Sequence, residues 1–153
     1  MTSEFMRDLL SKDEKITVEY KTCQFGIQED VYETVCSFSN RYGGYIIMGT
    51  EDDGTPIGVK QNMVKDMKRN FVNQLNNPDK MSPTLYLSIE DFEYEGKILL
   101  WVYVPPTATV EKCGNRIYDR NEDGDMDITD SPIQLQNMYN RKSTTYAVSY
   151  THL

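Results

Sequence analysis

Oxygen-bearing side chains recur at every second position in the segment 119–125. The segment matches the first six positions of a calcium-binding EF-hand loop, D-x-[DN]-x-[DN]-G, and Asp130 takes the twelfth position, where that loop has glutamate. Calcium prefers such hard oxygen ligands, and Gly124 would allow the sharp turn. The predicted ligands are Asp119, Asn121, Asp123, Asp125 and Asp130. An apparent strand precedes the segment, so an acidic surface loop without an ion is the alternative.

A second set of side chains could contact phosphate groups. Lysine and arginine on one side of a sheet and its adjacent helix would give weak, salt-dependent and largely sequence-independent binding of nucleic acid. Tyrosines near them could stack on bases. The alternative is a solvated helix face that only keeps the protein soluble. The predicted contact residues are Lys21, Lys65, Lys68, Arg69, Arg116 and Arg120, with Arg141 and Lys142 nearby and Tyr20, Tyr42 and Tyr118 for stacking.

A glycine-rich turn joins a predicted helix to a predicted buried strand. Its glycines suggest a phosphate-binding loop, but the lysine of the G-x-x-x-x-G-K-[ST] pattern is absent. Turn formation and close backbone approach are therefore the predicted roles of this segment. The residues that would form it are Asn40, Gly43, Gly44 and Gly49.

Both helices and strands are predicted to position these residues. Apolar periodicity predicts helices over 4–11, 28–42 and 61–76, and a last helix capped by Ser131 with Pro132 at its first position. Alternating or continuous apolar runs predict strands over 16–21, 45–50, 57–59, 84–92, 97–104 and 116–120. We expect an α+β fold: a mixed β-sheet of about five to six strands, flanked by two main helices plus short terminal helices. The domain would cover residues 1–142, and no pattern places the tail 143–153.

Composition limits the partners and the chemistry. The chain has 153 residues and a net charge of −8, which opposes avid non-specific binding of nucleic acid but allows a local basic face. Without a long apolar run or a signal peptide, we expect a cytoplasmic protein with no membrane contact. Three cysteines without C-x-x-C spacing indicate neither disulfides nor zinc. The single histidine, His152, lies in the unplaced tail, which argues against nucleophilic catalysis.

Four blocks in order resemble the Schlafen AlbA-type DNA-binding domain, also called the divergent AAA domain. TVEYK at 17–21 is similar to the opening E-[FY]-K strand of that family, and SFSNRYGGYIIMG at 37–49 to its A-F-A-N-x-x-G-G signature. The segment 52–59 is similar to the D-x-G-x-I-x-G-V hairpin, and RIYDR at 116–120 to the late Y-x-R strand. The blocks span roughly residues 10–140. The resemblance implies a module that precedes further domains in bacterial regulators.

The resemblance also implies a possible catalytic set. Nuclease members of the Schlafen group use three carboxylates, and Glu14, Glu19 and either Glu51 or Asp52 match them by position. Such a cluster would bind Mg²⁺ or Mn²⁺ and activate water against a phosphodiester. The alternative is an acidic turn beside a strand on which Glu19 pairs with a base.

The leading hypothesis is a nucleic-acid-binding module of a bacterial-type transcriptional regulator, non-catalytic by itself and requiring no cofactor. One alternative is a ribonuclease that depends on a divalent metal bound by the three carboxylates. Another is an oligomerisation or scaffold domain that forms a homo-oligomer, with or without calcium in the 119–130 loop.

Overall fold

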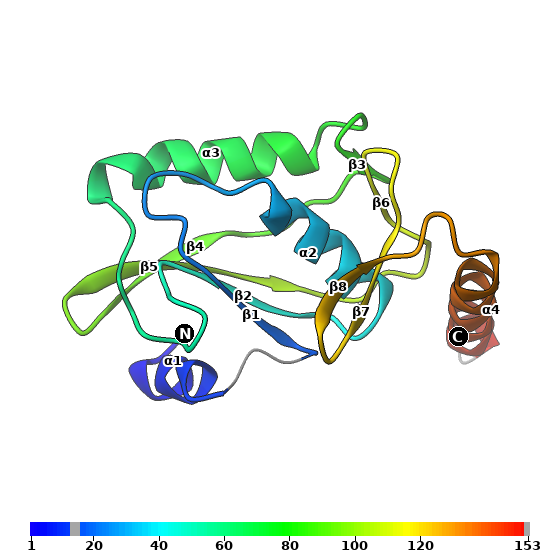
Figure 1. Ribbon diagram of the computed structural model, residues 1–153, viewed down its shortest axis with the longest axis horizontal. Coiled ribbons are helices and arrows are strands. Elements are labelled where there is room, and N and C mark those ends of the chain that lie inside the picture. The colour runs from blue at the N-terminus through cyan, green and yellow to red at the C-terminus, as the bar shows by residue number, and fades with distance from the viewer. Residues whose placement is uncertain (13–15, 152–153) are drawn as a thin grey trace.

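The computed structural model describes residues 1–12 and 16–151. Its centre is a four-stranded sheet in the order β1-β2-β5-β4, formed by Val18–Lys21, Gly44–Met48, Lys97–Val104 and Glu90–Tyr94. β1 runs parallel to β2, and the other neighbours are antiparallel, so the sheet is mixed. Helices lie on both sides of it (Figure 1). The predicted α+β class is confirmed.

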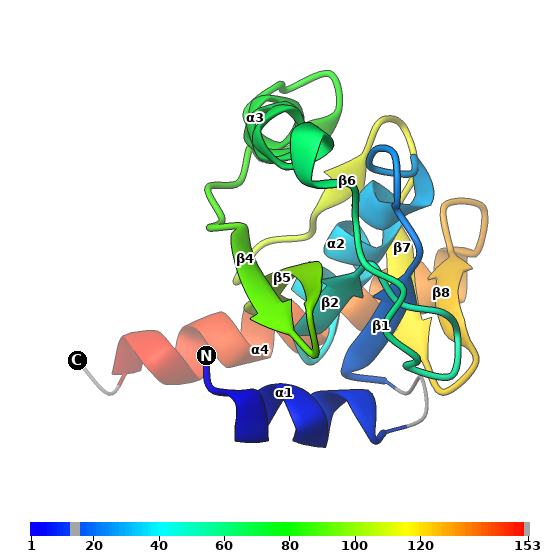
Figure 2. The same cartoon turned by 90° about the vertical axis from the view of Figure 1, so that its left-hand side faces the viewer.

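Two helices cover one face of the sheet and a third covers part of the other. α2 (Asp30–Asn40) and α3 (Val64–Leu75) bury Val35, Phe38 and Phe71 against the inward side chains of β2 and β5. α1 (Ser3–Leu10) packs Met6 and Leu9 on the opposite face (Figure 2). β2 is therefore buried on both faces, which explains its continuous apolar sequence.

Smaller elements surround this core. A 3₁₀ turn, η1 (Gln61–Met63), precedes α3, and β3 (Met81–Ser82) pairs with β6 (Lys112–Cys113). β7 (Tyr118–Asn121) and β8 (Gly124–Asp127) form a hairpin that contacts α2. α4 (Pro132–Thr151) starts at the predicted proline. Within the described ranges 1–12 and 16–151, no helix combines the length and apolar character needed to cross a membrane.

Several predicted boundaries were wrong. The main sheet has four strands, and the last helix is long, because the backbone of α4 continues through the predicted tail to Thr151. The segment 57–59 forms no strand, since Gly58 has a φ of 81° and interrupts the extended backbone. Residues 84–89 keep their alternation, with Leu85 and Leu87 packed on the core, but pairing begins only at Glu90.

The glycine-rich turn allows close approach between segments. Gly43 has a φ of 72°, and its N–H donates to the Phe38 carbonyl oxygen at 2.9 Å after α2 ends. A Cβ atom on Gly44 would lie 2.6 Å from the carbonyl oxygen of Thr17 and 2.8 Å from the Phe38 ring. A side chain at Gly44 would therefore push β1 away from β2.

Candidate functional site

Arg120 lies at the centre of a buried ion-pair network. Its guanidinium donates to Glu19 Oε2 at 2.8 Å and to Asp125 Oδ1 at 2.9 Å. The same group lies 4.7 Å from the centre of the Phe38 ring, a cation–π geometry. Only 3% of Arg120 is exposed. The prediction that Arg120 contacts phosphate is therefore wrong, because its charge is enclosed by β1, α2 and the β7–β8 hairpin.

Lys21 belongs to the same network. Its ammonium lies 3.4 Å from Glu19 Oε1 and donates to Asp30 Oδ2 at 2.9 Å. Burial alone would lower the pKa of Lys21, but the hydrogen bond that Lys21 donates to Asp30 and the nearby carboxylates raise it above the ordinary value. With its side chain only 11% exposed, Lys21 is occupied by these two acids.

The predicted nuclease carboxylates are not gathered in the described part of the chain. Glu14 lies outside the described residues. Glu19 is bound by Arg120 and Lys21, whereas Glu51 and Asp52 are exposed in the loop after β2. Among the described side chains, those of residues 1–12 and 16–143, no three His, Cys, Asp or Glu are grouped so that they could hold a metal ion.

The predicted calcium segment folds as the β7–β8 hairpin. Strand pairing places Asp119 opposite Met126 and Asn121 opposite Gly124. The Asn121 side-chain oxygen accepts from the Asp123 backbone N–H at 2.9 Å, which closes the turn locally. The backbone thus forms a two-stranded ladder rather than a loop wound around an ion.

Three of the predicted calcium ligands, Asp119, Asp125 and Asp130, are bound by arginine side chains. Asp119 accepts two hydrogen bonds from Arg41, at 3.0 and 2.6 Å. Asp130 accepts from Arg116 at 3.0 Å. Asp125, besides its contact with Arg120, accepts from the Ser37 hydroxyl at 2.5 Å. These carboxylates bind three separate arginines and do not converge on one point. Asp119 and Asp125 connect the hairpin to α2 and the residue after it, and Asp130 connects the two ends of the segment through Arg116.

Asn40 and Lys142 tie the last turn of α2 to later segments. The buried Asn40 amide donates to the Glu111 and Tyr118 carbonyl oxygens, each at 2.9 Å, and accepts from the Glu111 N–H. Lys142 Nζ donates to the carbonyl oxygens of Ser39 and Thr109, at 3.0 and 2.7 Å. The sequence indicated Asn40 only as a turn residue.

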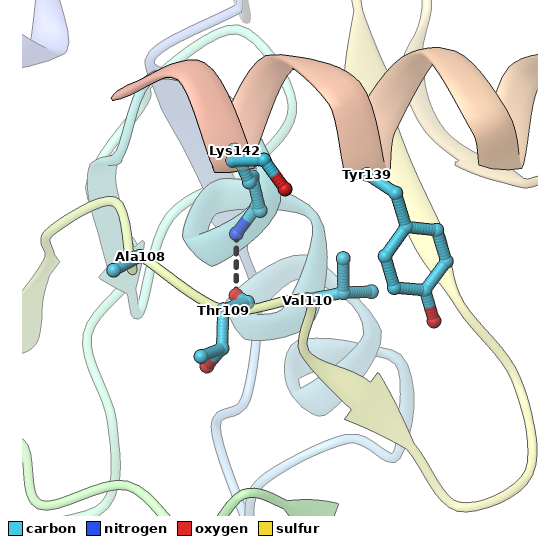
Figure 3. A pocket seen from close by; sticks show the side chains of 6 residues that line it. Ala108, Thr109, Val110, Tyr139 and Lys142 are labelled. Atoms are coloured by element: carbon cyan, nitrogen blue, oxygen red, sulfur yellow. Dashed lines mark hydrogen bonds between the residues drawn. The ribbon is translucent and has the colours of Figure 1, made fainter. Parts of the chain in front are cut away.

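Burial affects the charge of Lys142. Desolvation, with Arg141 close by, lowers the pKa of Lys142 to about 8. The residue lies at the edge of a pocket of about 360 Å³ between α4 and the 108–110 segment, where the apolar side chains are Ala108, Val110 and Tyr139 (Figure 3). Lys142 therefore anchors α4 and is not available on a basic surface.

The remaining predicted cations gather on α3. Lys65 and Arg69 are exposed, and Lys68 donates to Asp91. Gln61, Val64, Lys65, Lys68, Asp91 and Ile98 line an open hollow of about 380 Å³. Arg69 is 58% exposed and lies 3.5 Å from Asp66. Arg116 lies elsewhere, on the β7 side, and pairs with Asp127 and Asp130.

Two further residues extend this region, and sequence reasoning missed them. The Lys60 ammonium lies 5.7 Å from the centre of the Phe25 ring, which is 66% exposed. The Lys60 N–H donates to the Gln24 carbonyl oxygen at 2.9 Å, a contact that brings two distant loops together. We call the resulting set the α3 surface: Phe25, Lys60, Lys65, Lys68 and Arg69.

Comparison with solved structures finds the same fold. The N-terminal domain of a RecG-related protein of Nitrosomonas europaea is 26% identical, with a TM-score of 0.55, over 68% of this chain and 72% of that one. The DIP2311 protein of Corynebacterium diphtheriae is 17% identical, with a TM-score of 0.57, over 79% of this chain. The match spans only 25% of DIP2311.

Family comparison covers most of the chain. No curated protein sequence matches it significantly. The model of the family described as Schlafen, AlbA_2 matches residues 14–129, which include β1, the glycine-rich turn and the β7–β8 hairpin. The predicted resemblance is confirmed, and the chain belongs to the Schlafen AlbA_2 family.

Proposed function

We propose that this protein is a nucleic-acid-binding module whose α3 surface contacts phosphate groups. The observation that supports the proposal is the hollow beside α3, which Lys65 and Lys68 line, with the exposed Lys60 before the helix and the exposed Arg69 on it. Flexible, exposed ammonium groups suit phosphate contact, because each one displaces condensed counterions from the nucleic acid. The net charge of −8 restricts the contact to this local surface and keeps it weak.

A related protein supports the partner class. The RecG-related protein from N. europaea carries a name that refers to an ATP-dependent DNA helicase, and the matched part is its N-terminal domain. DIP2311 is about four times longer than the matched region, so this fold also occurs within a longer chain. We infer that the module acts as one part of a cytoplasmic transcriptional regulator and contributes binding rather than catalysis.

The proposed surface differs from the one predicted from the sequence. Lys21 and Arg120 form the network beneath α2, and Arg116 is paired within its own hairpin. Lys68 remains in the set although it is bound to Asp91, because both residues line the hollow. The phosphate contacts are therefore assigned to one helix and its preceding loop.

Fluorescence anisotropy with labelled DNA and RNA tests this function. At low salt we expect saturable binding that weakens about tenfold or more in a Lys65→Ala/Lys68→Ala/Arg69→Ala variant, since several phosphate contacts are lost. Lys112→Ala is the matched control, because Lys112 is an exposed lysine on β6, outside the α3 surface. Equal affinity of the triple variant and the wild type would assign any binding to another surface.

A further inference from the structure

The sheet face that carries α1 is only partly covered. Met6 and Leu9 of α1 pack on Val18, Ile47 and Leu99. Tyr45 on β2 and Tyr103 on β5 lie beyond this contact as a direct cross-strand pair. β4 begins at Glu90, opposite Trp101, so its ladder does not reach Tyr103. One end of the two central strands therefore carries aromatic residues, and Tyr103 there is 44% exposed. Figure 2 shows α1 on this side of the sheet.

These rings form a continuous group. The centre of the Tyr45 ring lies 5.0 Å from that of Tyr103, 6.2 Å from that of Trp101 and 5.5 Å from that of Phe5. Phe5, Tyr42 and Tyr103 are 40%, 58% and 44% exposed. Exposed aromatic side chains gathered in one place are typical of interaction sites. We call this set the aromatic surface: Phe5, Tyr42, Tyr45, Trp101 and Tyr103.

A hollow and a few charges adjoin the rings. Phe5, Tyr42, Tyr45 and Tyr103 line an open hollow of about 280 Å³, with the backbone of Gly43 and Gly44 and the side chains of Asp8 and Lys12. The Arg41 guanidinium lies 5.7 Å from the centre of the Tyr42 ring. Cations and carboxylates are therefore both present, since Asp8 lines the hollow and Glu90 pairs across from Trp101.

We propose that the aromatic surface binds the unpaired bases of single-stranded nucleic acid by stacking. Aromatic side chains on the central strands of a four-stranded sheet can stack two or three bases, provided that the bases are not already stacked in a duplex. Of the nearby cations, Lys12 lines the hollow but lies 3.7 Å from Asp8, and Arg41, beside the Tyr42 ring, binds Asp119. The net charge of −8 opposes a polyanion as well as a second copy of the chain, so stacking on the rings rather than charge would supply the binding energy.

This inference rests on the proposed function for its partner class but assigns the bases to a different surface. α3 and α1 pack on opposite faces of the sheet, so the α3 surface and the aromatic surface are separate. Each can therefore be changed without altering the other. The inference adds a preference for single strands, which phosphate contacts alone do not explain.

The single tryptophan makes the test direct. Trp101 is the only tryptophan of the chain and lies within the aromatic surface, so a stacked base should quench its fluorescence. We would titrate the full chain with oligo-dT and oligo-U of about twelve nucleotides, and with a duplex of equal length. We expect saturable quenching by DNA or RNA single strands and at least about tenfold weaker quenching by the duplex.

Matched variants distinguish the loss of the Tyr103 ring from a loss of the folded state. Tyr103→Ala should weaken binding of single strands about tenfold, whereas Tyr103→Phe keeps the ring and should bind within about twofold of the wild type. Tyr86→Ala is the control, because Tyr86 is 88% exposed and lies outside the aromatic surface. Thermal unfolding of each variant would show that the folded state is retained.

The outcomes distinguish this inference from the proposed function. In one outcome, the anisotropy of the labelled nucleic acid rises without quenching of Trp101, and binding is weakened by α3 variants but not by Tyr103→Ala. The proposed function then stands and the inference fails. If quenching depends on Tyr103 but not on α3, the inference stands and the α3 assignment fails. Absence of binding overturns both. A Trp101 signal that changes with protein concentration alone, together with a dimer in sedimentation, would identify a self-association interface and overturn the inference.

Discussion

Arg120 donates to Glu19 across 2.8 Å, although 101 positions separate the two residues in the chain. The contact joins β7 to β1, and the second carboxylate on Arg120, Asp125, accepts hydrogen bonds from two α2 hydroxyls. The E-x-K and Y-x-R blocks of the sequence thus meet in one buried network. Their charges position β1, α2 and the β7–β8 hairpin relative to one another.

Replacing Arg120 should destabilise the protein strongly. Arg120→Ala leaves Glu19 and Asp125, with side chains only 13% and 17% exposed, without their shared cation. We expect a loss of about 3–5 kcal/mol in the free energy of unfolding, measured by urea titration. Arg116→Ala is the matched control, because Arg116 also binds two carboxylates but is 44% exposed. That control should lose much less, because its ion pairs are exposed to solvent, and an equally small loss for Arg120→Ala would contradict the assignment of a buried network.

Glu111 should make stability fall as pH rises. Only 1% of the residue is exposed, and its carboxylate oxygens have no hydrogen-bond partner within the described part of the chain. Desolvation raises the pKa of Glu111 from 4.5 to about 8, although the Lys142 ammonium opposes the shift. Between these values the folded state keeps a proton that the unfolded state releases, so each pH unit costs about 1.4 kcal/mol of stability.

The Glu111→Gln variant isolates this effect. Glutamine stays neutral, so the variant should gain stability relative to the wild type steadily from about pH 5 to about pH 8. The measurement is the difference in unfolding free energy between the two proteins at each pH. A difference that stays constant over this interval would show that Glu111 is ionised in the folded state.

Calcium should leave the stability unchanged. Asp119, Asp125 and Asp130 are bound by arginine side chains, and an ion would have to displace those contacts and reshape the hairpin. We expect no shift in the thermal midpoint at millimolar calcium, a concentration that fills weak extracellular-type sites. A saturable rise in the midpoint, lost in Asp123→Asn, would restore the calcium hypothesis.

Local patterns in the sequence predicted much of the fold. The apolar run of β5 and the spacing of α2 and α3 report burial directly, so these elements were found with small errors at the ends. The segment 84–89 shows the limit, because Leu85 and Leu87 alternate inward without joining a ladder. The alternation of apolar side chains indicates which face of a segment is buried. Backbone pairing also requires a neighbouring strand, which the alternation does not indicate.

The candidate site was harder to predict, because the sequence shows which residues are charged but not which of them are exposed. Arg120 and Arg69 are the same residue type, so the sequence alone does not distinguish them. Arg120 is enclosed by two carboxylates, whereas Arg69 lies on an open helix face. Lys60 joins Phe25 through a loop contact that no local pattern reports. The aromatic surface also escaped prediction, because Tyr45 and Tyr103 meet only when β2 and β5 pair.

If the α3 surface contacts phosphate groups, the binding of nucleic acid must depend on salt concentration in a way that the α3 cations determine. The logarithm of the binding constant should fall linearly with the logarithm of salt concentration, with each phosphate contact adding about 0.7–0.9 to the slope. Removing Lys65, Lys68 and Arg69 together should reduce that slope by about two to three, while Lys112→Ala leaves it unchanged. A triple variant that binds with the wild-type slope would contradict phosphate contact by the α3 surface.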